Sequence, residues 1–268
     1  GHGLPNYQAI GAQDIQPAIS ELLSKAEAAV AKSTASDTAN TWDDLVEPLE
    51  EATEALGRAW GVIGHLNSVK DSPELRDAYG AMLPEVTAFW SRLGQNLELY
   101  KKYKALKESA SFSSLNTAQK KVIENALRDF RLGGAELSDT EKPRFSEIQE
   151  RQATLAKEFS DHVLDATDQF VYATDKPEDV AGIPEDALAS AAQLALEKGL
   201  RGWAFSLHFP SYFPVQQYAN NRTLRQKMYE AYVTRASELG PQYGQGQAEW
   251  NNQANVLEQL RLRDEEAK

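Results

Sequence analysis

The sequence contains no cysteine and only four histidines. The absence of cysteine excludes disulfides, thiol nucleophiles and thiolate metal sites, and it fits a cytoplasmic location. We interpret residues 1–3, which include His2, as a remnant of cloning. No apolar run approaches the roughly 18–20 residues that span a bilayer, and the N-terminus lacks the basic and apolar segments of a signal peptide. We therefore expect no membrane as a partner.

Positive charge is also scarce, with 28 Lys and Arg residues against 40 Asp and Glu residues and a formal net charge of -12. An acidic surface repels nucleic acid, which is itself a polyanion, so we expect no nucleic-acid partner. With 268 residues, of which 41% are hydrophobic, the chain can bury a substantial core as one large domain or two smaller ones.

Apolar residues recur at steps of three and four in the first third of the chain, as in amphipathic helices. One such stripe covers residues 15–30 and another covers 45–63, where Thr41 is the expected N-cap. A helix is predicted over 72–107, with a kink or break at Pro84 because proline lacks the N–H donor that a helix interior requires.

The remaining elements are predicted from capping residues and from changes in periodicity. Asn116 begins a helix that Gly133 ends, and Ser138 with Glu141 forms a capping box for a helix that reaches Ala166. Two short strands and three further helices complete the prediction: strands at 169–174 and 202–208, and helices at 184–199, from Asn220 or Asn221 to 237, and from about Glu249.

This pattern predicts a mainly α fold, a multi-helix bundle of long antiparallel helices with a small β-hairpin insertion. The last predicted helix reaches Lys268 without a glycine cap or turn residues. We therefore expect the chain to be truncated within or after that helix, as a piece of a longer protein.

The remaining histidines do not form a catalytic zinc pattern, which would place two of them one helical turn apart beside a glutamate. His65 and His208 fit packing or hydrogen-bonding roles at the ends of their elements. His162 has Glu158 and Asp165 as helical neighbours and could hold a weak divalent ion, but we favour a solvated helix face. Glycine loops that bind phosphate are also absent from the sequence.

One stretch reverses the charge of the chain, because residues 201–237 contain five basic residues and one acidic residue. Helical spacing places Leu224 and Met228 on a core face and Arg222, Arg225 and Tyr229 on a neighbouring face. Pairing with an acidic helix of the same chain would explain the arginines. The candidate residues for contacts with a peptide or another domain are Tyr212, Tyr218, Arg222, Arg225 and Tyr229.

Several segments resemble the N-terminal part of the thimet-oligopeptidase-like zinc metallopeptidases, in particular the oligopeptidase A group. The resemblance covers residues 4–268. The segments that carry it are Leu4–Pro5, Gln16–Ile19, Thr41–Leu45, His65–Arg76, Leu115–Lys121, Asn125–Phe130, Val163–Thr167, Pro210–Tyr212, Pro214–Val215, Met228–Tyr229 and Thr234–Ser237.

The resemblance implies a mostly helical, two-lobed enzyme whose deep channel admits short peptides for hydrolysis in the cytoplasm. Zinc in that family is bound by a His-Glu-x-x-His helix and a later glutamate, all in the C-terminal half. None of these has a counterpart here, so we assign no catalytic or metal residue and no cofactor to this chain.

The resemblance thus makes residues 4–268 a non-catalytic, channel-wall domain, inactive alone, whose partners are the C-terminal catalytic half and short peptides. The alternative is a stand-alone helical interaction module that binds acidic peptides or a partner protein.

Overall fold

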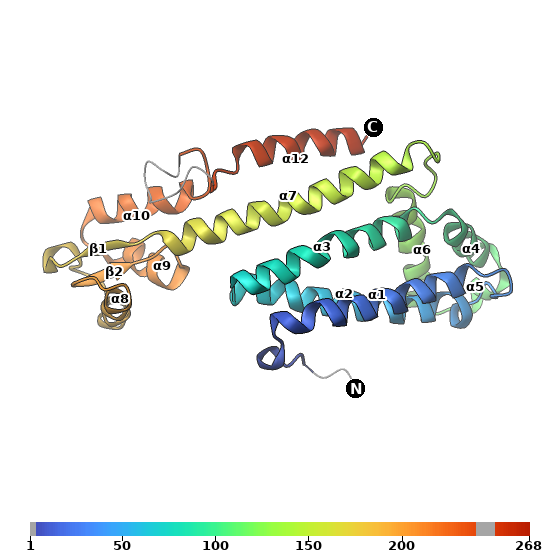
Figure 1. The fold of residues 1–268 in the computed structure, drawn as a ribbon, viewed down its shortest axis with the longest axis horizontal. Helices are drawn as coiled ribbons and strands as arrows, with labels where there is room; N and C mark the ends of the chain where they lie inside the picture. Colours follow the sequence, from blue (N-terminus) through green and yellow to red (C-terminus); the bar gives the residue numbers. More distant parts are fainter. Residues whose placement is uncertain (1–3, 240–249) are drawn as a thin grey trace. The chain divides into compact units, whose positions relative to one another are not determined.

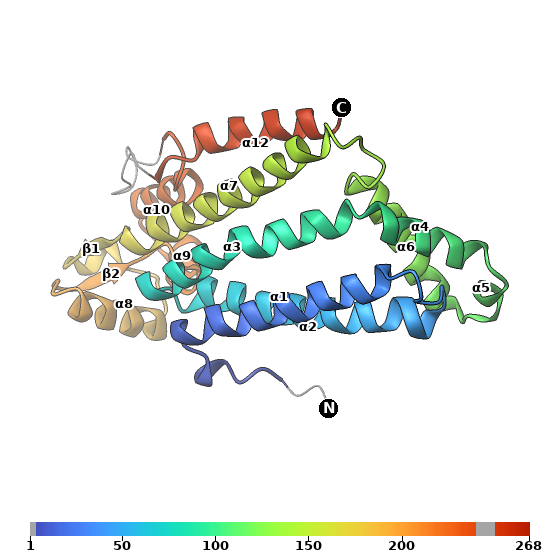
Figure 2. The ribbon, with the colours of Figure 1, turned by 45° about the vertical axis from the view of Figure 1, so that its right-hand side comes forward.

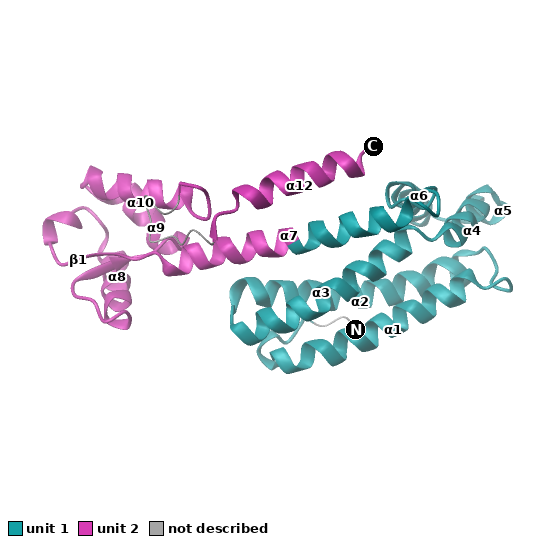
Figure 3. Cartoon of the chain, turned by 45° about the horizontal axis from the view of Figure 1, so that its top comes forward, with its two compact units in different colours: residues 1–154 teal, residues 155–268 magenta. Residues whose placement is uncertain are grey.

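A computed structural model of the chain describes residues 4–239 and 250–268. The chain divides into two compact units, residues 1–154 (unit 1) and residues 155–268 (unit 2), which are coloured separately in Figure 3. The fold is mainly α with one small antiparallel sheet, which confirms the predicted fold class.

Unit 1 is helical throughout its described elements. They are the short 3-10 helix Tyr7–Ala9, α1 (Ala12–Thr34), a π-helical turn (Trp42–Val46), α2 (Glu47–Val69), α3 (Pro73–Gly94), α4 (Leu97–Glu108), α5 (Ala110–Ser114), α6 (Thr117–Leu132) and the first part of α7 (Lys142–Gln169). Helices α1, α2 and α3 pack side by side (Figures 1 and 2).

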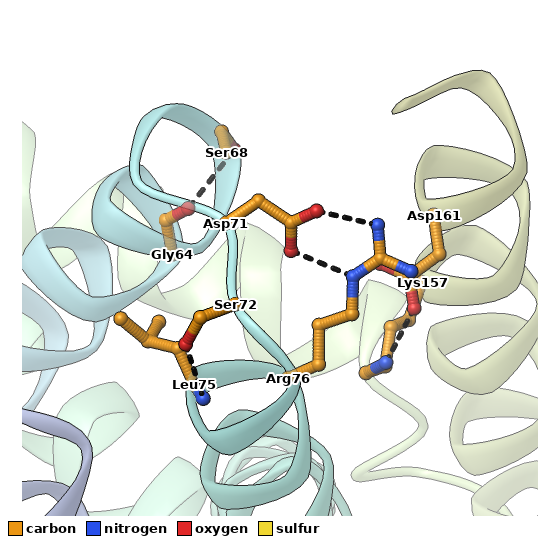
Figure 4. A network of polar contacts seen from close by, with 8 residues as sticks. All are labelled: Gly64, Ser68, Asp71, Ser72, Leu75, Arg76, Lys157 and Asp161. Atoms are coloured by element: carbon orange, nitrogen blue, oxygen red, sulfur yellow. Dashed lines mark hydrogen bonds and ion pairs between the residues drawn. The ribbon is translucent and has the colours of Figure 1, made fainter. Parts of the chain in front are cut away.

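The capping residues read from the sequence act as predicted in unit 1. The hydroxyl of Ser72 accepts a hydrogen bond from the N–H of Leu75 at 3.2 Å. In the same turn Asp71 receives two hydrogen bonds from the guanidinium of Arg76, each 2.6 Å long, as Figure 4 shows. The carboxylate and the guanidinium are both mostly buried, so this fork fixes the three-residue connection between α2 and α3.

The helix predicted from Ser72 to Lys107 is in fact two helices. Helix α3 continues through Pro84, so the expected break there is wrong, and it ends at Gly94. The side chain of Asn96 then accepts a hydrogen bond from the N–H of Leu99 at 2.9 Å and begins α4. A local capping residue, and not the proline, therefore sets the break.

Two apolar clusters hold unit 1 together. The first joins α1, α2 and α3 and contains Ile15, Ile19, Leu56, Ile63, Met82 and Phe89. The second joins the π-helical turn and the start of α2 with α4 and α6, and it contains Leu45, Leu49, Leu99, Tyr103, Ile123 and Phe130. The apolar stripes predicted for residues 15–30 and 45–63 supply much of both clusters.

Unit 2 combines helices with the small sheet. Its elements are the second part of α7, β1 (Tyr172–Thr174), a 3-10 turn (Pro177–Asp179), α8 (Glu185–Glu197), β2 (Trp203–Phe205), α9 (Phe209–Tyr218), α10 (Arg222–Thr234) and α12 (Gln253–Glu266). Strands β1 and β2 pair antiparallel, with Ala173 opposite Ala204. Gly202, at φ +77°, turns the chain into β2 in a conformation that favours glycine.

The sequence predicted most of unit 2 but missed α9. No helix was assigned to residues 209–218, yet α9 forms there with Pro210 in its first turn, where a missing N–H costs little. Helix α10 ends at Thr234, three residues before the predicted end. The expected start of the last helix at Glu249 lies outside the described residues.

One apolar core closes unit 2. It contains Phe170, Val180, Phe205, Leu207, Val215, Leu224 and Met228. Leu224 and Met228 are buried, which confirms the core face predicted for α10. The opposite face of α10 is therefore the part left for contacts.

Candidate functional site

Two consecutive helices carry the predicted contact residues. Tyr212 and Tyr218 lie on α9, and Arg222, Arg225 and Tyr229 lie on α10. The side chain of Asn221 positions α10, because its Oδ1 accepts from the N–H of Leu224 at 3.1 Å while its Nδ2 donates to Asp179 at 3.0 Å. The N-terminus of α10 is thus fixed by one capping amide.

Tyr212 lies in the core of unit 2. Its side chain is buried, and its ring stacks on that of Tyr232 with centroids 4.1 Å apart and planes 11° apart. The guanidinium of Arg235 lies over the ring of Tyr232, 4.0 Å from its centroid. Burial is the main cause that raises the pKa of the Tyr212 hydroxyl; repulsion from the phenolate forms of Tyr232 and Tyr229 raises it further, and the Arg235 charge opposes the shift. The placement of Tyr212 therefore favours a packing role over a contact role.

Arg225 is engaged within the chain, although not as expected. Its Nη1 donates to the carbonyl oxygens of Ala219 and Asn220, and its own carbonyl oxygen accepts from Gln216 Nε2 at 2.8 Å. These contacts satisfy carbonyl groups at the C-terminal end of α9. The expected pairing with an acidic helix is thus wrong for Arg225, which instead ties α9 to α10.

The other three predicted residues are exposed. Tyr218 and Tyr229 expose 46% and 53% of their surface. Arg222 is exposed and has no hydrogen bond or ion pair within residues 4–239 and 250–268. Helical spacing puts Arg222, Tyr229 and Val233 on one face of α10. We call this set the α10 face, and it presents a guanidinium, a phenol and an apolar side chain to solvent.

A second exposed aromatic feature was missed because α9 itself was missed. The rings of Phe209 and Phe213 stack with centroids 4.9 Å apart and planes 19° apart, and they are 59% and 44% exposed. Residues four apart share a helix face, so the repeated Phe-Pro spacing could have revealed this pair once a helix was assumed.

His162 does not lie on a solvated face, as the sequence suggested. Its Nδ1 lies 2.7 Å from Oδ1 of Asn252, whose Nδ2 donates to the carbonyl oxygen of Phe159 at 3.2 Å. Asn255 donates in the same way to the carbonyl oxygen of Leu155 at 2.8 Å. Buried amides thus attach α12 to α7.

The other two histidines fit the roles expected for them. His208 Nε2 lies 2.8 Å from the Asp168 carboxylate, and both side chains are about half exposed. His65 meets the ring of Tyr7 edge to face, with centroids 5.4 Å apart. Exposed contacts of this kind contribute little to stability.

Apolar side chains also remain exposed along α12. A hollow of about 340 Å³ lies between α7 and α12 and is lined partly by Phe159, Val256 and Leu260. Leu260 is 58% exposed and the adjacent Leu257 is 62% exposed. This edge of unit 2 is an apolar surface that α12 only partly covers.

The described residues hold no group of three or more His, Asp or Glu side chains that could bind a metal ion. Glu158, His162 and Asp165 therefore do not form the weak metal site considered from the sequence. In the same part of the chain, no helix is long and apolar enough to cross a membrane.

Comparisons with known proteins give a consistent result. Residues 19–142 match the family model described as "Neurolysin/Thimet oligopeptidase, N-terminal domain". The chain is similar to oligopeptidase A of Haemophilus influenzae, with 43% identity over 99% of this chain and 38% of that protein. It is 40% identical to oligopeptidase A of Escherichia coli, over 98% of this chain and 38% of that protein. Organellar oligopeptidase A of Arabidopsis thaliana is 36% identical, over 98% of this chain and 33% of that protein.

Proposed function

This chain belongs to the oligopeptidase A and thimet oligopeptidase family, and we propose that it is the non-catalytic N-terminal domain of a longer, zinc-dependent oligopeptidase. One observation carries the proposal: the similarity to oligopeptidase A runs along 99% of this chain while the chain spans only 38% of that relative's length. The remaining part of the relative, which has no counterpart in this chain, is long enough to contain a catalytic half. That half would be the partner of this domain.

In this proposal the chain forms part of the wall of a channel that accepts short peptides and excludes folded proteins. A wall of this kind acts by steric exclusion and needs no reactive group. The exposed α10 face supports the idea, because a guanidinium pairs with peptide carboxylates and a phenol donates to peptide carbonyl groups. Tyr218 is a further candidate, since it lies on α9 and is nearly half exposed.

Zinc does not fit the described residues of this chain. Zinc sites use clustered nitrogen, sulfur or carboxylate ligands, and no such cluster is formed by the described His, Asp and Glu side chains. The proposed metal would belong to the part of the longer protein outside this chain. We place that protein in the cytoplasm, supported by the absence of cysteine and by similarity to a protein named probable cytosolic oligopeptidase A of Arabidopsis thaliana.

Internally quenched peptide substrates provide the direct test. Purified chain 1–268, supplied with zinc, should not cleave them, because it contributes no metal ligands. Mixing it with the separately purified remainder of the longer protein should raise the activity of that remainder. Metal-dependent cleavage by chain 1–268 alone, with contaminating proteases excluded, would show that the proposal is wrong.

A stand-alone module that binds acidic peptides is the other candidate, and it rests on the five basic residues of the 201–237 stretch. The contacts that residues 201–237 form in the structure support such a module less than their basic composition does. Arg225 binds backbone carbonyl groups and Arg235 covers Tyr232, so both are used within the fold. Sequencing the coding region beyond residue 268 separates the two, because only a peptidase continues into a His-Glu-x-x-His segment.

A further inference from the structure

Unit 1 contains a hollow of about 540 Å³ that is lined by residues of α2, α3, α4 and α6. None of these helices carries a residue of the α10 face. Its volume lies within the range of about 300–1,000 Å³ that is usual for small-molecule sites. Three aromatic residues line it, Trp90, Tyr103 and Phe130, and three carboxylates lie at its border, Glu50, Glu54 and Asp129. Among the residues that the structure describes, no lysine, arginine or histidine lines it.

The hydroxyl of Tyr103 is the unusual group in this hollow. Tyr103 is 1% exposed, and its ring meets Phe130 edge to face with centroids 5.5 Å apart. Its hydroxyl has no hydrogen-bond partner within residues 4–239 and 250–268, whereas the hydroxyl of Tyr100 donates to Glu136 at 3.2 Å. Because this hydroxyl lines the hollow and forms no bond within the described chain, it is free to bond a ligand there.

Glu50 is the carboxylate best placed to balance a ligand's charge. Asp129 already accepts a hydrogen bond from Arg128 at 2.8 Å, and Glu54 has Arg58 at 3.7 Å. Glu50 has no basic partner among the described residues. Burial raises the pKa of the Glu50 carboxyl, and the charge of Glu54 raises it further. The negative charge beside the aromatic rings is therefore not compensated within the fold.

We propose that this hollow binds an organic cation, an ammonium or guanidinium group on an apolar stem. Trp90 and Phe130 would contact the stem and attract the positive charge through their ring faces. The Tyr103 hydroxyl oxygen would accept a hydrogen bond from the cation, and the Glu50 carboxylate would pair with it. Such a cation is carried either by a free amine or by a basic side chain of a peptide. The proposal does not depend on the proposed function, because it uses none of the residues of α9 and α10.

Fluorine NMR of the full chain labelled with 5-fluorotryptophan would detect the binding at one residue. The chain has five tryptophans, and Trp90→Phe identifies the Trp90 signal by its loss. Phenethylammonium chloride should shift that signal in a saturable manner, and the uncharged analogue 3-phenylpropan-1-ol should bind at least tenfold more weakly. N-acetyl-lysine methylamide tests the peptide source: tighter binding than phenethylammonium assigns the site to peptides, and weaker binding assigns it to free amines.

Three variants test the assigned roles. Glu50→Gln should weaken phenethylammonium binding about tenfold, and Tyr103→Phe should weaken it several-fold while leaving the chain folded, because the lost hydroxyl has no partner. Glu51→Gln removes the same charge from the next residue of α2, which does not line the hollow, and should change little. Three results would each overturn the proposal: no saturable shift of the Trp90 signal, equal binding of the alcohol, or equal losses in Glu50→Gln and Glu51→Gln.

Discussion

His162 Nδ1 and Asn252 Oδ1 lie 2.7 Å apart and join α7 to α12 through a side-chain hydrogen bond. Because Asn252 Nδ2 donates to the carbonyl oxygen of Phe159, its Oδ1 is the acceptor and the proton of this bond lies on His162 Nδ1. The backbone N–H of Asn252 also donates to the carbonyl oxygen of Ala236 at 2.9 Å. One buried asparagine thus connects three segments of unit 2.

Replacing Asn252 by alanine should destabilise unit 2 by about 1–3 kcal/mol, because the change removes two partly buried side-chain hydrogen bonds and leaves their partners unsatisfied. Urea denaturation followed by circular dichroism measures the change in the free energy of unfolding. Gln253→Ala, at the exposed next residue, is the matched control and should change it by less than about 0.5 kcal/mol. Similar losses in the two variants would contradict the role given to the amide.

The fork between Asp71 and Arg76 predicts a second stability effect. Asp71→Ala should cost about 1–3 kcal/mol, because the mostly buried guanidinium loses two charged hydrogen bonds. Glu21→Ala removes an exposed pair with Lys25 of similar length, 2.5 Å, and should lower stability much less because solvent screens that pair. Thermal melts of both variants compare the two pairs, and equal shifts in Tm would show that burial of the fork has no effect.

Glu50 predicts a dependence of stability on pH. Its pKa is raised in the folded chain, so the folded state binds its proton more tightly than the unfolded state does. Stability contributed by this proton is present below the unfolded pKa and is lost as pH rises through the folded pKa. Glu50→Gln should therefore match the unaltered chain at pH 3 and exceed it at pH 7, by roughly a few tenths of a kcal/mol because the carboxylate remains partly hydrated.

The control for that effect is Glu51→Gln, which lowers the net negative charge equally. Urea denaturation at several pH values measures both variants. If Glu51→Gln produced the same gain at pH 7, general charge repulsion in this acidic chain would explain the result, and the raised pKa of Glu50 would not.

The α10 face predicts an effect on peptide binding in the longer protein. Arg222→Ala and Tyr229→Ala should raise KM for short peptides several-fold with little change in kcat or Tm, because both side chains are exposed and would bind the peptide without supporting the fold. Arg225→Ala should instead lower Tm, since its guanidinium binds carbonyl groups at the end of α9. An unchanged KM in both exposed variants would remove the α10 face from the proposed channel wall.

Much of the fold could be predicted because helix ends depend on local chemistry. Ser72, Asn116 and Asn221 each cap the helix that the sequence assigned to them, through bonds to an N–H three residues later. The errors also have local causes. Asn96 caps α4 inside a span that was predicted as one helix. No helix was predicted at α9, where Pro210 lies in the first turn and a missing N–H costs little.

The candidate site was less predictable, because it depends on contacts between distant segments. Spacing placed Arg225 and Tyr229 on one face, but only the position of the α9 terminus shows that Arg225 is used internally. The Tyr103 hydroxyl likewise lacks a partner because of how four helices pack around it, and no sequence motif predicts that packing. The spacing of residues along the sequence therefore predicts which helix face a side chain lies on. Only tertiary packing determines whether its polar group already has a hydrogen-bond partner.

Helix α7 is shared by the two units, since the boundary between residues 154 and 155 falls inside its span of Lys142–Gln169. Dividing the chain there would cut a helix near its middle and create two new ends, each with about four unpaired backbone groups. Leu155, whose carbonyl oxygen also holds Asn255, would become a frayed terminus. The two units are thus poor candidates for separate expression or for exchange between homologues, and a recombination point in a loop that flanks α7 would be better tolerated.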